Sequence, residues 1–275
     1  MAMEQLEVLR ALMRDAGSAL VAFSGGVDSA LVARVAYEEL GDRAVALTAD
    51  SPTFPKEECE EATRFAAELG ITHELVDSQE LEREGYAANA GDRCYFCKSE
   101  LFELARDRAA ALGMAFVMDG TITDDLGAHR PGLQASAEHA VRHPLVEAGF
   151  DKAAVREAAR SLGMAVWDKP SFACLGSRFP VGTRVTRDRV EKVGRVESVL
   201  RFFGFRQFRV RYHTVEDQPM ARIELDPAEL AGLVAEGVRE AVLEACKAEG
   251  FRWVTLDLAG YKTGGLSLPI GKSVG

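Results

Sequence analysis

The 275-residue sequence has no apolar run long enough to cross a membrane. A spanning helix needs about 18 or more consecutive apolar residues, and the opening stretch, MAMEQLEVLRALMRD, lacks the basic-then-apolar pattern of a secretory signal. We therefore expect a cytoplasmic protein with no membrane partner. Hydrophobic residues make up 47% of the chain and charged residues 28%, which is ordinary for a protein with one large core or two modest ones.

The sequence also lacks a surplus of positive charge. Its 33 lysines and arginines stand against 43 aspartates and glutamates, for a formal charge of −10. Binding to a phosphate backbone depends on cations that displace condensed counterions. The charge balance therefore disfavours a nucleic-acid partner and leaves only a local basic face as a route to one.

Cysteine is scarce, and the chain has five, an odd number. In a reducing compartment such cysteines serve as core residues, metal ligands or nucleophiles more often than as disulfides. Cys59 and Cys246 each recur with apolar residues at helical spacing, which predicts core positions for both. Cys94, Cys97 and Cys174 remain as candidates for chemistry.

Short apolar runs alternate with helical patterns through the first half of the chain, after an amphipathic opening helix. This rhythm is typical of βαβ units and predicts an α/β fold, a parallel sheet with helices on both faces. The expected strands lie at residues 19–23, 44–48, 72–76 and 115–120, and the expected helices at residues 28–40, 56–70, 94–113 and 152–164.

Between Trp167 and Gly182 the periodicity lapses and prolines and glycines recur, which predicts a domain junction. We expect a first domain over residues 1–180 and a smaller α+β domain over residues 181–275 that serves substrate binding or oligomerisation. The expected elements of the second domain are a helix at residues 186–203, strands at 207–213, 221–225 and 252–258, and a helical region at 227–249.

The most specific motif is a six-residue loop, Ser24-Gly25-Gly26-Val27-Asp28-Ser29, between a buried strand and a helix. Paired glycines let backbone N–H groups approach an anion closely, and the helix N-terminus adds partial positive charge. The hydroxyls of Ser24 and Ser29 add donors. This combination predicts a phosphate site, and the Asp28 carboxylate beside it predicts a Mg²⁺ ion that bridges to the phosphate.

Cys94 and Cys97 lie one turn apart where a helix is expected to start, and a helix N-terminus favours the thiolate form. The pattern fits a redox pair, half of a zinc site or part of an iron–sulfur cluster. No second Cys-x-x-Cys or paired histidine completes a four-ligand zinc site. With Cys174, which lies on a loop, three thiolates on a four-iron cluster would leave one iron open. Two thiols packed under a helix with Tyr95 and Phe96 are the structural alternative.

Polar residues follow the expected strand at residues 115–120, in the segment DGTITDDLGAHRPG. Loops at the carboxyl ends of parallel strands face the ligand crevice of such sheets. The acidic pair Asp124 and Asp125 could hold Mg²⁺ or a ribose hydroxyl, and Arg130 could meet phosphate. Turn capping by Asp124 and simple solvation of Arg130 are the structural alternatives.

Two arginines share one face of the expected strand at residues 207–213. Period-two alternation places Arg209 and Arg211 opposite the apolar residues of that strand. Stacked arginines can clamp phosphate or carboxylate, and cross-strand pairing with glutamate is the alternative. Ser177 and Arg178 lie beside the loop cysteine.

The six-residue loop resembles the pyrophosphate loop, SGGxDS, of the ATP pyrophosphatase superfamily. Within that superfamily, Ala173-Cys174-Leu175-Gly176-Ser177-Arg178 resembles the A-C-L-x-S-R loop of the LarE family. The resemblance covers nearly the whole chain. It extends through TADSP at residues 48–52, RCYFCK at 93–98, DGTITDDLGAHRPG at 119–132 and GFRQFRVRYH at 204–213.

The resemblance implies an ATP-dependent sulfur transferase that helps to build the nickel-pincer nucleotide cofactor. A carboxylate of pyridinium-3,5-biscarboxylic acid mononucleotide would attack the α-phosphate and release pyrophosphate. Sulfur would then convert the acyl adenylate to a thiocarboxylate. The implied partners are the small-molecule mononucleotide and the enzymes upstream and downstream in the cofactor pathway, and we also expect a homo-oligomer.

The resemblance also assigns roles at matching positions. The nucleotide ligands would be Ser24, Gly25, Gly26, Asp28, Ser29, Thr48, Ser51, Gly120, Thr121, Asp125 and Arg130. The catalytic residues would be Cys174, Ser177, Arg178 and Glu197, and the substrate anion ligands Arg209 and Arg211. Asp28 would hold Mg²⁺, and Cys94, Cys97 and Cys174 would hold a [4Fe-4S] cluster that passes on an added sulfide.

Three alternatives stay open. Family members of another type sacrifice the loop cysteine, which ends as dehydroalanine, so sacrifice of Cys174 is the rival of the cluster route. A tRNA thiolation enzyme would use the same phosphate loop and would have to bind tRNA. A nucleotide-binding module without catalysis would bind ATP and release no pyrophosphate in response to a substrate.

Overall fold

The computed structural model describes residues 2–126, 131–170 and 172–262. The chain forms two compact units. The first consists of Met1–Glu80 and Asp92–Phe172, and the second of Leu81–Gly91 and Ala173–Gly275. A short segment from the first third of the sequence thus belongs to the second unit. The boundary after residue 180 inferred from the sequence stays a prediction.

The first unit is built on a parallel sheet with the strand order β3-β2-β1-β4. Its strands are β1 (Ala19–Ala22), β2 (Ala44–Asp50), β3 (Thr72–Asp77) and β4 (Phe116–Met118). The chain runs from β1 through β2 to β3 on one side and then places β4 on the other side of β1. The order in which the chain adds strands to the sheet therefore reverses between β1 and β4. Open α/β sheets bind ligands at such a switch point.

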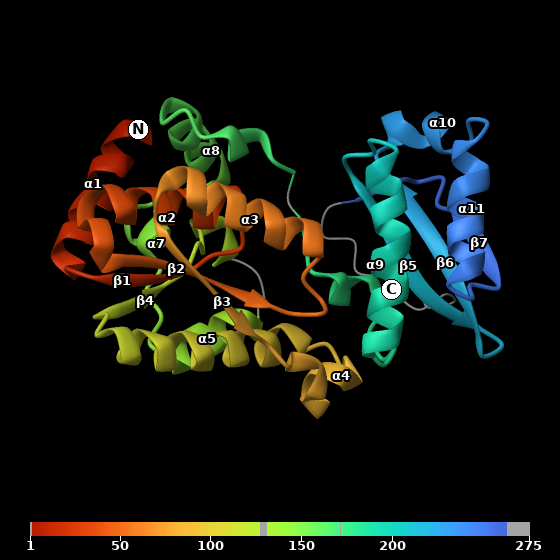
Figure 1. The fold of residues 1–275 in the computed structure, drawn as a ribbon, viewed down its shortest axis with the longest axis horizontal. Helices are drawn as coiled ribbons and strands as arrows, with labels where there is room; N and C mark the ends of the chain where they lie inside the picture. The colour runs from red at the N-terminus through yellow and green to blue at the C-terminus, as the bar shows by residue number, and fades with distance from the viewer. Residues whose placement is uncertain (1, 127–130, 171, 263–275) are drawn as a thin grey trace. The chain divides into compact units, whose positions relative to one another are not determined.

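Helices cover both faces of this sheet, as the sequence predicted (Figure 1). One core cluster packs the four helices α1 (Ala2–Ala16), α2 (Val27–Leu40), α3 (Lys56–Leu69) and α8 (Lys152–Ser161) against the sheet. A second cluster packs the opposite face against α5 (Arg93–Leu112) and α6 (Pro131–Glu138). The short helix α7 (Pro144–Glu147) joins the first cluster. The predicted α/β fold is confirmed.

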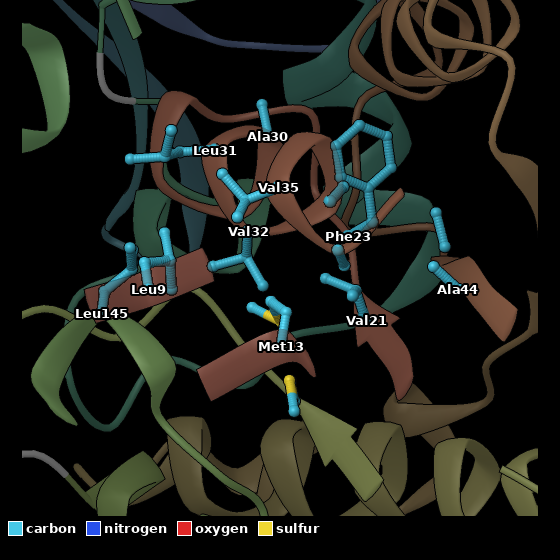
Figure 2. Packing of buried hydrophobic residues seen from close by; sticks show 14 of the residues in the cluster. Leu9, Met13, Val21, Phe23, Ala30, Leu31, Val32, Val35, Ala44 and Leu145 are labelled. Atoms are coloured by element: carbon cyan, nitrogen blue, oxygen red, sulfur yellow. The ribbon is translucent and has the colours of Figure 1, made fainter. Parts of the chain in front are cut away.

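The core fixes α2 onto β1, as Figure 2 shows. Leu9 and Met13 of α1 and Val32 of α2 are completely buried, together with Val21 of β1. Full burial of one such side chain contributes about 1.5–3 kcal/mol. The loop between β1 and α2 is therefore held at both ends by close-packed apolar side chains.

The second unit is a three-stranded mixed sheet with two long helices against it. The strands β5 (Phe208–Val215) and β6 (Gln218–Leu225) pair antiparallel, and β6 pairs parallel with β7 (Trp253–Leu256). The helix α9 (Arg187–Phe202) packs on β5 and on α11 (Val238–Ala248), and α9 is seen beside β5 in Figure 1. This is the small α+β region that the sequence predicted.

One expected helix is divided in two. The sequence predicted a single helical region over residues 227–249, whereas the structure forms α10 (Leu230–Leu233) and α11, separated by residues 234–237. Gly237 precedes α11 with φ +81°, which a residue with a side chain rarely adopts. The left-handed glycine breaks the helix and lets α11 start in a new direction.

Asn89 explains why the segment Leu81–Gly91, which contains the short helix α4 (Glu84–Ala88), belongs to the second unit. Its side-chain amide donates to the carbonyl oxygens of Phe179, Pro180 and Thr183 at 3.3, 2.8 and 3.1 Å. These carbonyls lie in, or directly after, the stretch where the sequence periodicity lapses. A buried amide thus supplies hydrogen bonds that this irregular backbone cannot make within itself.

In the described part of the chain, every helix is too short or too polar to span a lipid bilayer.

Candidate functional site

In the loop that begins at Ser24, the backbone makes hydrogen bonds with the side-chain hydroxyl of Ser29. Gly25 adopts φ +69°, and a Cβ there would lie only 3.0 Å from the Cβ of Ala62 on α3. The Ser29 hydroxyl donates to the Gly26 carbonyl at 3.1 Å and accepts from the Ser24 N–H at 3.2 Å. The glycine is therefore required by conformation and by space, and Ser29 sets the curvature of the loop.

No side chain caps the first turn of α2. The residue before the helix is Gly26, in an extended conformation, and it offers no side-chain oxygen. The backbone N–H groups at the start of this 14-residue helix are oriented to bind an anion, with the helix dipole behind them. A Cβ at Gly120, after β4, would lie 2.6 Å from the Ser29 nitrogen. The absence of a side chain at position 120 lets the loop after β4 approach the backbone at the start of α2.

Two lysines that the sequence did not single out flank this loop. Lys152, the first residue of α8, places Nζ 2.9 and 2.8 Å from the two carboxylate oxygens of Asp28. Lys169 places Nζ 3.5 Å from the Gly25 carbonyl oxygen and 2.8 Å from carboxylate oxygens of Glu58 and of Glu61. The loop is thus bordered by cations that are paired with carboxylates.

Thr48, predicted to bind nucleotide, uses its hydroxyl inside the protein. The hydroxyl donates to the Phe23 carbonyl at 2.6 Å, and His73 Nε2 lies 2.8 Å from the same oxygen. Because the hydroxyl proton goes to the carbonyl, His73 acts as the donor in the second bond. Burial lowers the pKa of His73, which favours the neutral ring. Thr48 therefore ties β2 to the residue that precedes the loop.

Ser51, the other predicted ligand after β2, belongs to a buried network around Glu80. Its hydroxyl donates to a Glu80 carboxylate oxygen, and the Thr53 hydroxyl donates to that oxygen at 2.8 Å. The Ser78 hydroxyl lies 2.7 Å from the second Glu80 oxygen and 3.1 Å from an oxygen of Glu100. These hydrogen bonds order the segments that follow β2 and β3.

Asp119 lies directly after β4 and is buried. It accepts hydrogen bonds from the Thr121 N–H at 3.0 Å and the Thr121 hydroxyl at 2.9 Å, and His143 Nδ1 lies 2.7 Å away. Lys98 on α5 adds its charge at 3.8 Å. Burial by itself raises the pKa of Asp119, but the His143 hydrogen bond and the two nearby cationic groups outweigh it and lower the pKa to about 2. The predicted ligand Thr121 is thus held in place by an ionised carboxylate.

The acidic pair in this loop has structural contacts of its own. Asp125 accepts from the Ile122 N–H at 3.2 Å and caps the turn, and Asp124 accepts from the Lys152 N–H at 3.2 Å. Asp124 therefore fixes the start of α8 beside the loop. The predicted phosphate ligand Arg130 lies outside the described residues.

Cys94 and Cys97 lie in the first turn of α5, as the sequence predicted. Cys94 is exposed and Cys97 is half-buried. Residues three apart on a helix share a face, so the two sulfur atoms belong to one side of the helix start. The preceding residue, Asp92, makes no side-chain cap.

The loop that carries Cys174 is organised by Arg178 within the second unit. Arg178 is completely buried, and its Nη1 donates to the carbonyls of Ala173 and Cys174 at 2.6 and 3.0 Å and to the Ser177 hydroxyl at 2.9 Å. Its Nε and Nη2 donate to the two carboxylate oxygens of Glu197, both at 2.8 Å. One guanidinium therefore defines the shape of the whole turn, and Cys174 itself is half-buried.

Glu197 and Arg211 extend this network into the sheet. Glu197 also accepts from the Val210 N–H on β5 at 2.8 Å. Arg211 donates from Nη1 to the Ser177 carbonyl at 2.9 Å and from Nε and Nη2 to one oxygen of Glu224 at 3.0 and 2.8 Å. The structure thus brings together Cys174, Ser177, Arg178, Glu197 and Arg211, which the sequence placed in separate segments.

Arg209 lies on the same strand and is 3% exposed. Its Nη1 donates to the Phe208 carbonyl at 2.6 Å, and its guanidinium lies 4.9 Å from the ring centroid of Tyr261. Burial, followed by the positive charge of Arg178, lowers the pKa of Arg209 to about 10. The group stays charged at neutral pH in a region that already holds another buried cation, so a bound anion would stabilise it.

Both faces of β5 are buried, which the alternating pattern did not predict. His213 lies among these charges and accepts from Arg222 Nε at 3.2 Å through its Nε2. Burial, followed by the charges of Arg222 and Arg211, lowers the pKa of His213 to about 4. The ring is therefore neutral at pH 7 and serves as an acceptor.

Comparisons with known proteins identify relatives of this chain. The family model for NAD synthase matches residues 4–112. An uncharacterised protein of Synechocystis sp. is 45% identical over 96% of this chain and 97% of its own length. The pyridinium-3,5-bisthiocarboxylic acid mononucleotide synthase of Lactiplantibacillus plantarum is 38% identical over 93% of this chain and 91% of its own length. The tRNA-specific 2-thiouridylase of a Caulobacter species is 28% identical over 55% of this chain and 46% of its own.

The chain belongs to the LarE family. It is an ATP-utilising sulfurtransferase with a PP-loop domain. ATP binding follows from the family.

Two cysteines of this LarE-family chain, Cys59 and Cys246, have a raised thiol pKa. Burial raises the pKa of Cys246 to about 12, and burial, followed by the charges of Asp50 and Glu60, raises the pKa of Cys59. Cys246 is completely buried, as predicted, whereas Cys59 is only half-buried, so the core prediction is wrong for Cys59. Cys59, on α3, is one of the residues that line a surface hollow. Both thiols are protonated at neutral pH.

Among the described residues, no group of three histidine, cysteine, aspartate or glutamate side chains is placed to hold a metal ion.

Several polar residues of this LarE-family chain escaped the sequence analysis. Lys152, Lys169 and His143 have no local motif, because each acquires its partner from a distant segment. Glu224 on β6 is a further residue of this kind. Its position opposite Arg209 in the β5–β6 register could have indicated an Arg–Glu cluster.

Proposed function

We propose that this protein adenylates a carboxylate of pyridinium-3,5-biscarboxylic acid mononucleotide and converts it to a thiocarboxylate, as a step of nickel-pincer nucleotide biosynthesis. The observation that carries the proposal is the pairing of two built sites in one LarE-family chain. One is an uncapped helix start behind a glycine loop, which suits a phosphate. The other is a cysteine turn shaped by a buried arginine.

ATP supplies the activation step. The backbone N–H groups at the start of α2 and the hydroxyl of Ser24 are donors for its phosphates, and charge that develops on the α-phosphate meets dipoles already in place. The Ser29 hydroxyl shapes the loop, since it already donates to the Gly26 carbonyl. Asp28 is the residue that would hold Mg²⁺, since its carboxylate is part of the loop and is 27% exposed. A bound Mg²⁺ would neutralise phosphate charge.

Arg209 and Arg211 are the proposed ligands for the anionic groups of the substrate. Arg209 carries a buried positive charge near that of Arg178, which favours a bound anion. Arg211 is held by Glu224 and by the Ser177 carbonyl, so its guanidinium is fixed relative to the cysteine turn. The substrate carboxylates would then be held close to the turn that carries Cys174.

Cys94, Cys97 and Cys174 are the residues that would hold a [4Fe-4S] cluster, because thiolates are the ligands of such clusters. Each is at least partly exposed, and none of the three lies in an apolar core. When bound through three thiolates, such a cluster supplies an exchangeable sulfide at its fourth iron. Arg178 binds the backbone carbonyls of Ala173 and Cys174, which fixes the backbone from which the thiol extends. Transfer of sulfur from Cys174 itself is the rival route.

The test is substrate-dependent pyrophosphate release by anaerobically purified full-length protein. We expect pyrophosphate release when both ATP and the biscarboxylic acid mononucleotide are present, and we expect a thiocarboxylate product. The purified protein should contain iron and sulfide in equal amounts, four of each per cluster. ATP turnover that responds to tRNA instead, with tRNA retained in a filter-binding assay, would show a tRNA thiolation enzyme. ATP binding with no pyrophosphate release under either condition would show a module without catalysis.

A further inference from the structure

Asp119 and His143 form a hydrogen-bonded pair at the carboxyl edge of the parallel sheet. Residues 141–143 run alongside β4, where the Arg142 N–H donates to the Val117 carbonyl at 3.0 Å and the Asp119 N–H donates to the Arg142 carbonyl at 3.2 Å. His143 therefore ends a short segment beside β4, just as Asp119 directly follows β4. Both side chains belong to the edge at which open α/β sheets bind ligands.

The Asp119 carboxylate fixes the proton on the histidine ring. Asp119 is 3% exposed and ionised at neutral pH, since its pKa is lowered to about 2. A carboxylate has no proton to donate, so His143 Nδ1 is the donor in the bond of 2.7 Å. The Thr121 N–H, the Thr121 hydroxyl and the Lys98 ammonium group hold the same carboxylate, at 3.0, 2.9 and 3.8 Å. In the neutral ring the lone pair therefore lies on Nε2.

The Nε2 atom of His143 is open to a ligand. Within residues 2–126, 131–170 and 172–262, the bond from Nδ1 to Asp119 is the one hydrogen bond of this ring, and the side chain is 21% exposed. A histidine that is held at Nδ1 by a carboxylate and unpaired at Nε2 has the arrangement of a general base.

The pair borders the nucleotide loop and the helix start that carries two cysteines. Gly120 directly follows Asp119 and approaches the Ser29 nitrogen so closely that a Cβ would lie 2.6 Å from it. Lys98, with Nζ 3.8 Å from the Asp119 carboxylate, directly follows Cys97 in α5. All of these residues belong to the first unit. The histidine is therefore linked to the phosphate site and to the cysteine-bearing turn through its carboxylate partner.

Sulfur transfer releases a proton, whereas adenylation does not. In adenylation a carboxylate oxygen attacks the α-phosphate, and pyrophosphate leaves with the electron pair of the broken P–O bond. In sulfur transfer an S–H group attacks the acyl carbon, a C–S bond forms, and the C–O bond to AMP breaks with its electron pair on AMP. The S–H proton must pass to a base, whether the sulfur arrives as hydrosulfide or as the Cys174 thiol. The step needs no oxidant or reductant.

We propose that His143 is a catalytic base of the second step, in which Nε2 accepts the proton of the S–H group that attacks the acyl adenylate. Asp119 holds the ring and stabilises the imidazolium that forms. The proposal rests on the proposed function, because it requires an acyl adenylate. Proton acceptance by a positioned histidine accelerates such a step by about 10²- to 10⁴-fold.

The competing explanation is a static hydrogen bond that fastens residues 141–143 to β4. The backbone bonds of Arg142 already do this, and Leu145 and Phe150, which follow, are completely buried in the core. A fastening role predicts lower stability and an equal effect on both steps of the reaction. It predicts no loss that is confined to sulfur transfer.

His143→Asn separates the two explanations. The asparagine amide can replace Nδ1–H as the donor to Asp119, but it has no counterpart of Nε2 that accepts a proton. Rapid-quench single turnovers of the full-length, anaerobically purified protein, with ATP, the biscarboxylic acid mononucleotide and sodium sulfide, measure pyrophosphate and thiocarboxylate separately. We expect pyrophosphate formation within about twofold of the wild type and thiocarboxylate formation slower by about 10²- to 10⁴-fold, so that acyl adenylate accumulates.

His139→Asn is the matched control. His139 belongs to the same unit, and its ring packs against Phe102 with 6.4 Å between the ring centroids. Both steps should keep their wild-type rates in this variant. Imidazole added to His143→Ala should restore part of the thiocarboxylate formation and leave pyrophosphate formation unchanged, because it can occupy the space of the lost ring.

The tautomer can be measured without turnover. Nitrogen NMR of histidine-labelled wild type at mildly alkaline pH, with the His143 signals assigned by their loss in His143→Asn, should show the proton on Nδ1 and none on Nε2. A proton on Nε2 would overturn the proposal, since that atom could then accept none.

Three kinetic outcomes also decide against it. Unchanged thiocarboxylate formation in His143→Asn, with normal pyrophosphate release, removes the role of the histidine and leaves the proposed function intact. Equal slowing of both steps indicates a structural role. A wild type that releases no pyrophosphate removes the proposed function and this inference together.

Discussion

Arg178 and Glu197 form a bidentate ion pair in which both hydrogen bonds measure 2.8 Å and both side chains are buried. The remaining donor of Arg178, Nη1, goes to the backbone on either side of the cysteine sulfur. The pair is therefore the structural link between α9 and the turn of Cys174. A role in shaping this turn accounts for these contacts of Arg178.

Loss of Arg178 should destabilise the second unit strongly. Arg178→Met leaves the Glu197 carboxylate buried without its counterion, and breaking a buried pair in this way costs about 3–5 kcal/mol. Arg195→Met is the matched control, because Arg195 makes the same two-bond contact with Glu249, at 2.7 Å each, but is 53% exposed. Its loss should cost about 1 kcal/mol or less.

Urea unfolding of the two variants provides the comparison. Mass-mapped thiol labelling under native conditions should also show faster modification of Cys174 in Arg178→Met than in Arg195→Met. Equal free energies of unfolding for the two variants, with unchanged labelling, would contradict the role given to Arg178.

Gly120 should tolerate no side chain. In Gly120→Ala the new Cβ would be placed 2.6 Å from the Ser29 nitrogen, a backbone atom that cannot move without reshaping the phosphate loop. We expect ATP affinity to fall by more than tenfold, about 1.4 kcal/mol or more. Gly232→Ala is the control, since its Cβ would meet the Phe205 ring at 3.3 Å in the second unit, and it should leave ATP affinity unchanged. Normal ATP binding by Gly120→Ala would show that the two loops do not need their close approach.

Asp119 should make stability depend on pH in the acid range. Its pKa is lowered from 3.8 to about 2 in the folded protein, so folding favours the ionised form. The stabilisation is present in full above pH 3.8 and is lost as the pH falls through about 2. A shift of this size corresponds to about 2 kcal/mol.

The test is the difference in free energy of unfolding between the wild type and Asp119→Asn as a function of pH. The difference should be constant from pH 7 to pH 5 and shrink below about pH 4. Asp188→Asn, which removes an exposed charge on α9, should show a difference near zero throughout. A difference for Asp119→Asn that grows toward low pH would show that the sign of the shift is wrong.

The sequence predicted the elements of both units well because their signals are local. Apolar periodicity located β1, α2, α5 and α9 to within a few residues, and paired glycines marked the loop between the first two. The sequence did not predict that the helical region at residues 227–249 divides into α10 and α11, since the φ of Gly237 depends on how the flanking helices pack.

The site residues differ in the same respect: local sequence position indicates where some of them lie, whereas their contacts depend on distant segments. Ser24 and Gly120 follow the parallel strands β1 and β4, as the sequence predicted. Thr48 was assigned through the family resemblance and lies within β2. Whether a hydroxyl there is available to a ligand depends on its partners, and Thr48 donates to the Phe23 carbonyl. The ion pair of Lys152 joins residues 124 apart. No single-sequence pattern reports such contacts, because they exist only after the chain has folded.

The route of sulfur can be decided by single-turnover mass measurements on cysteine variants. Cys94→Ala removes one proposed cluster ligand, so it should abolish repeated turnover and lower the iron content. If Cys174 were sacrificed instead, Cys94→Ala would still deliver one equivalent of product, and the intact chain would lose the mass of one H₂S. Cys59→Ala is the control, since its protonated thiol belongs to neither route. We expect the wild type to keep its full mass over several turnovers and Cys94→Ala to make no product. Single-equivalent product from both proteins, with the mass loss at Cys174, would assign the sulfur to Cys174.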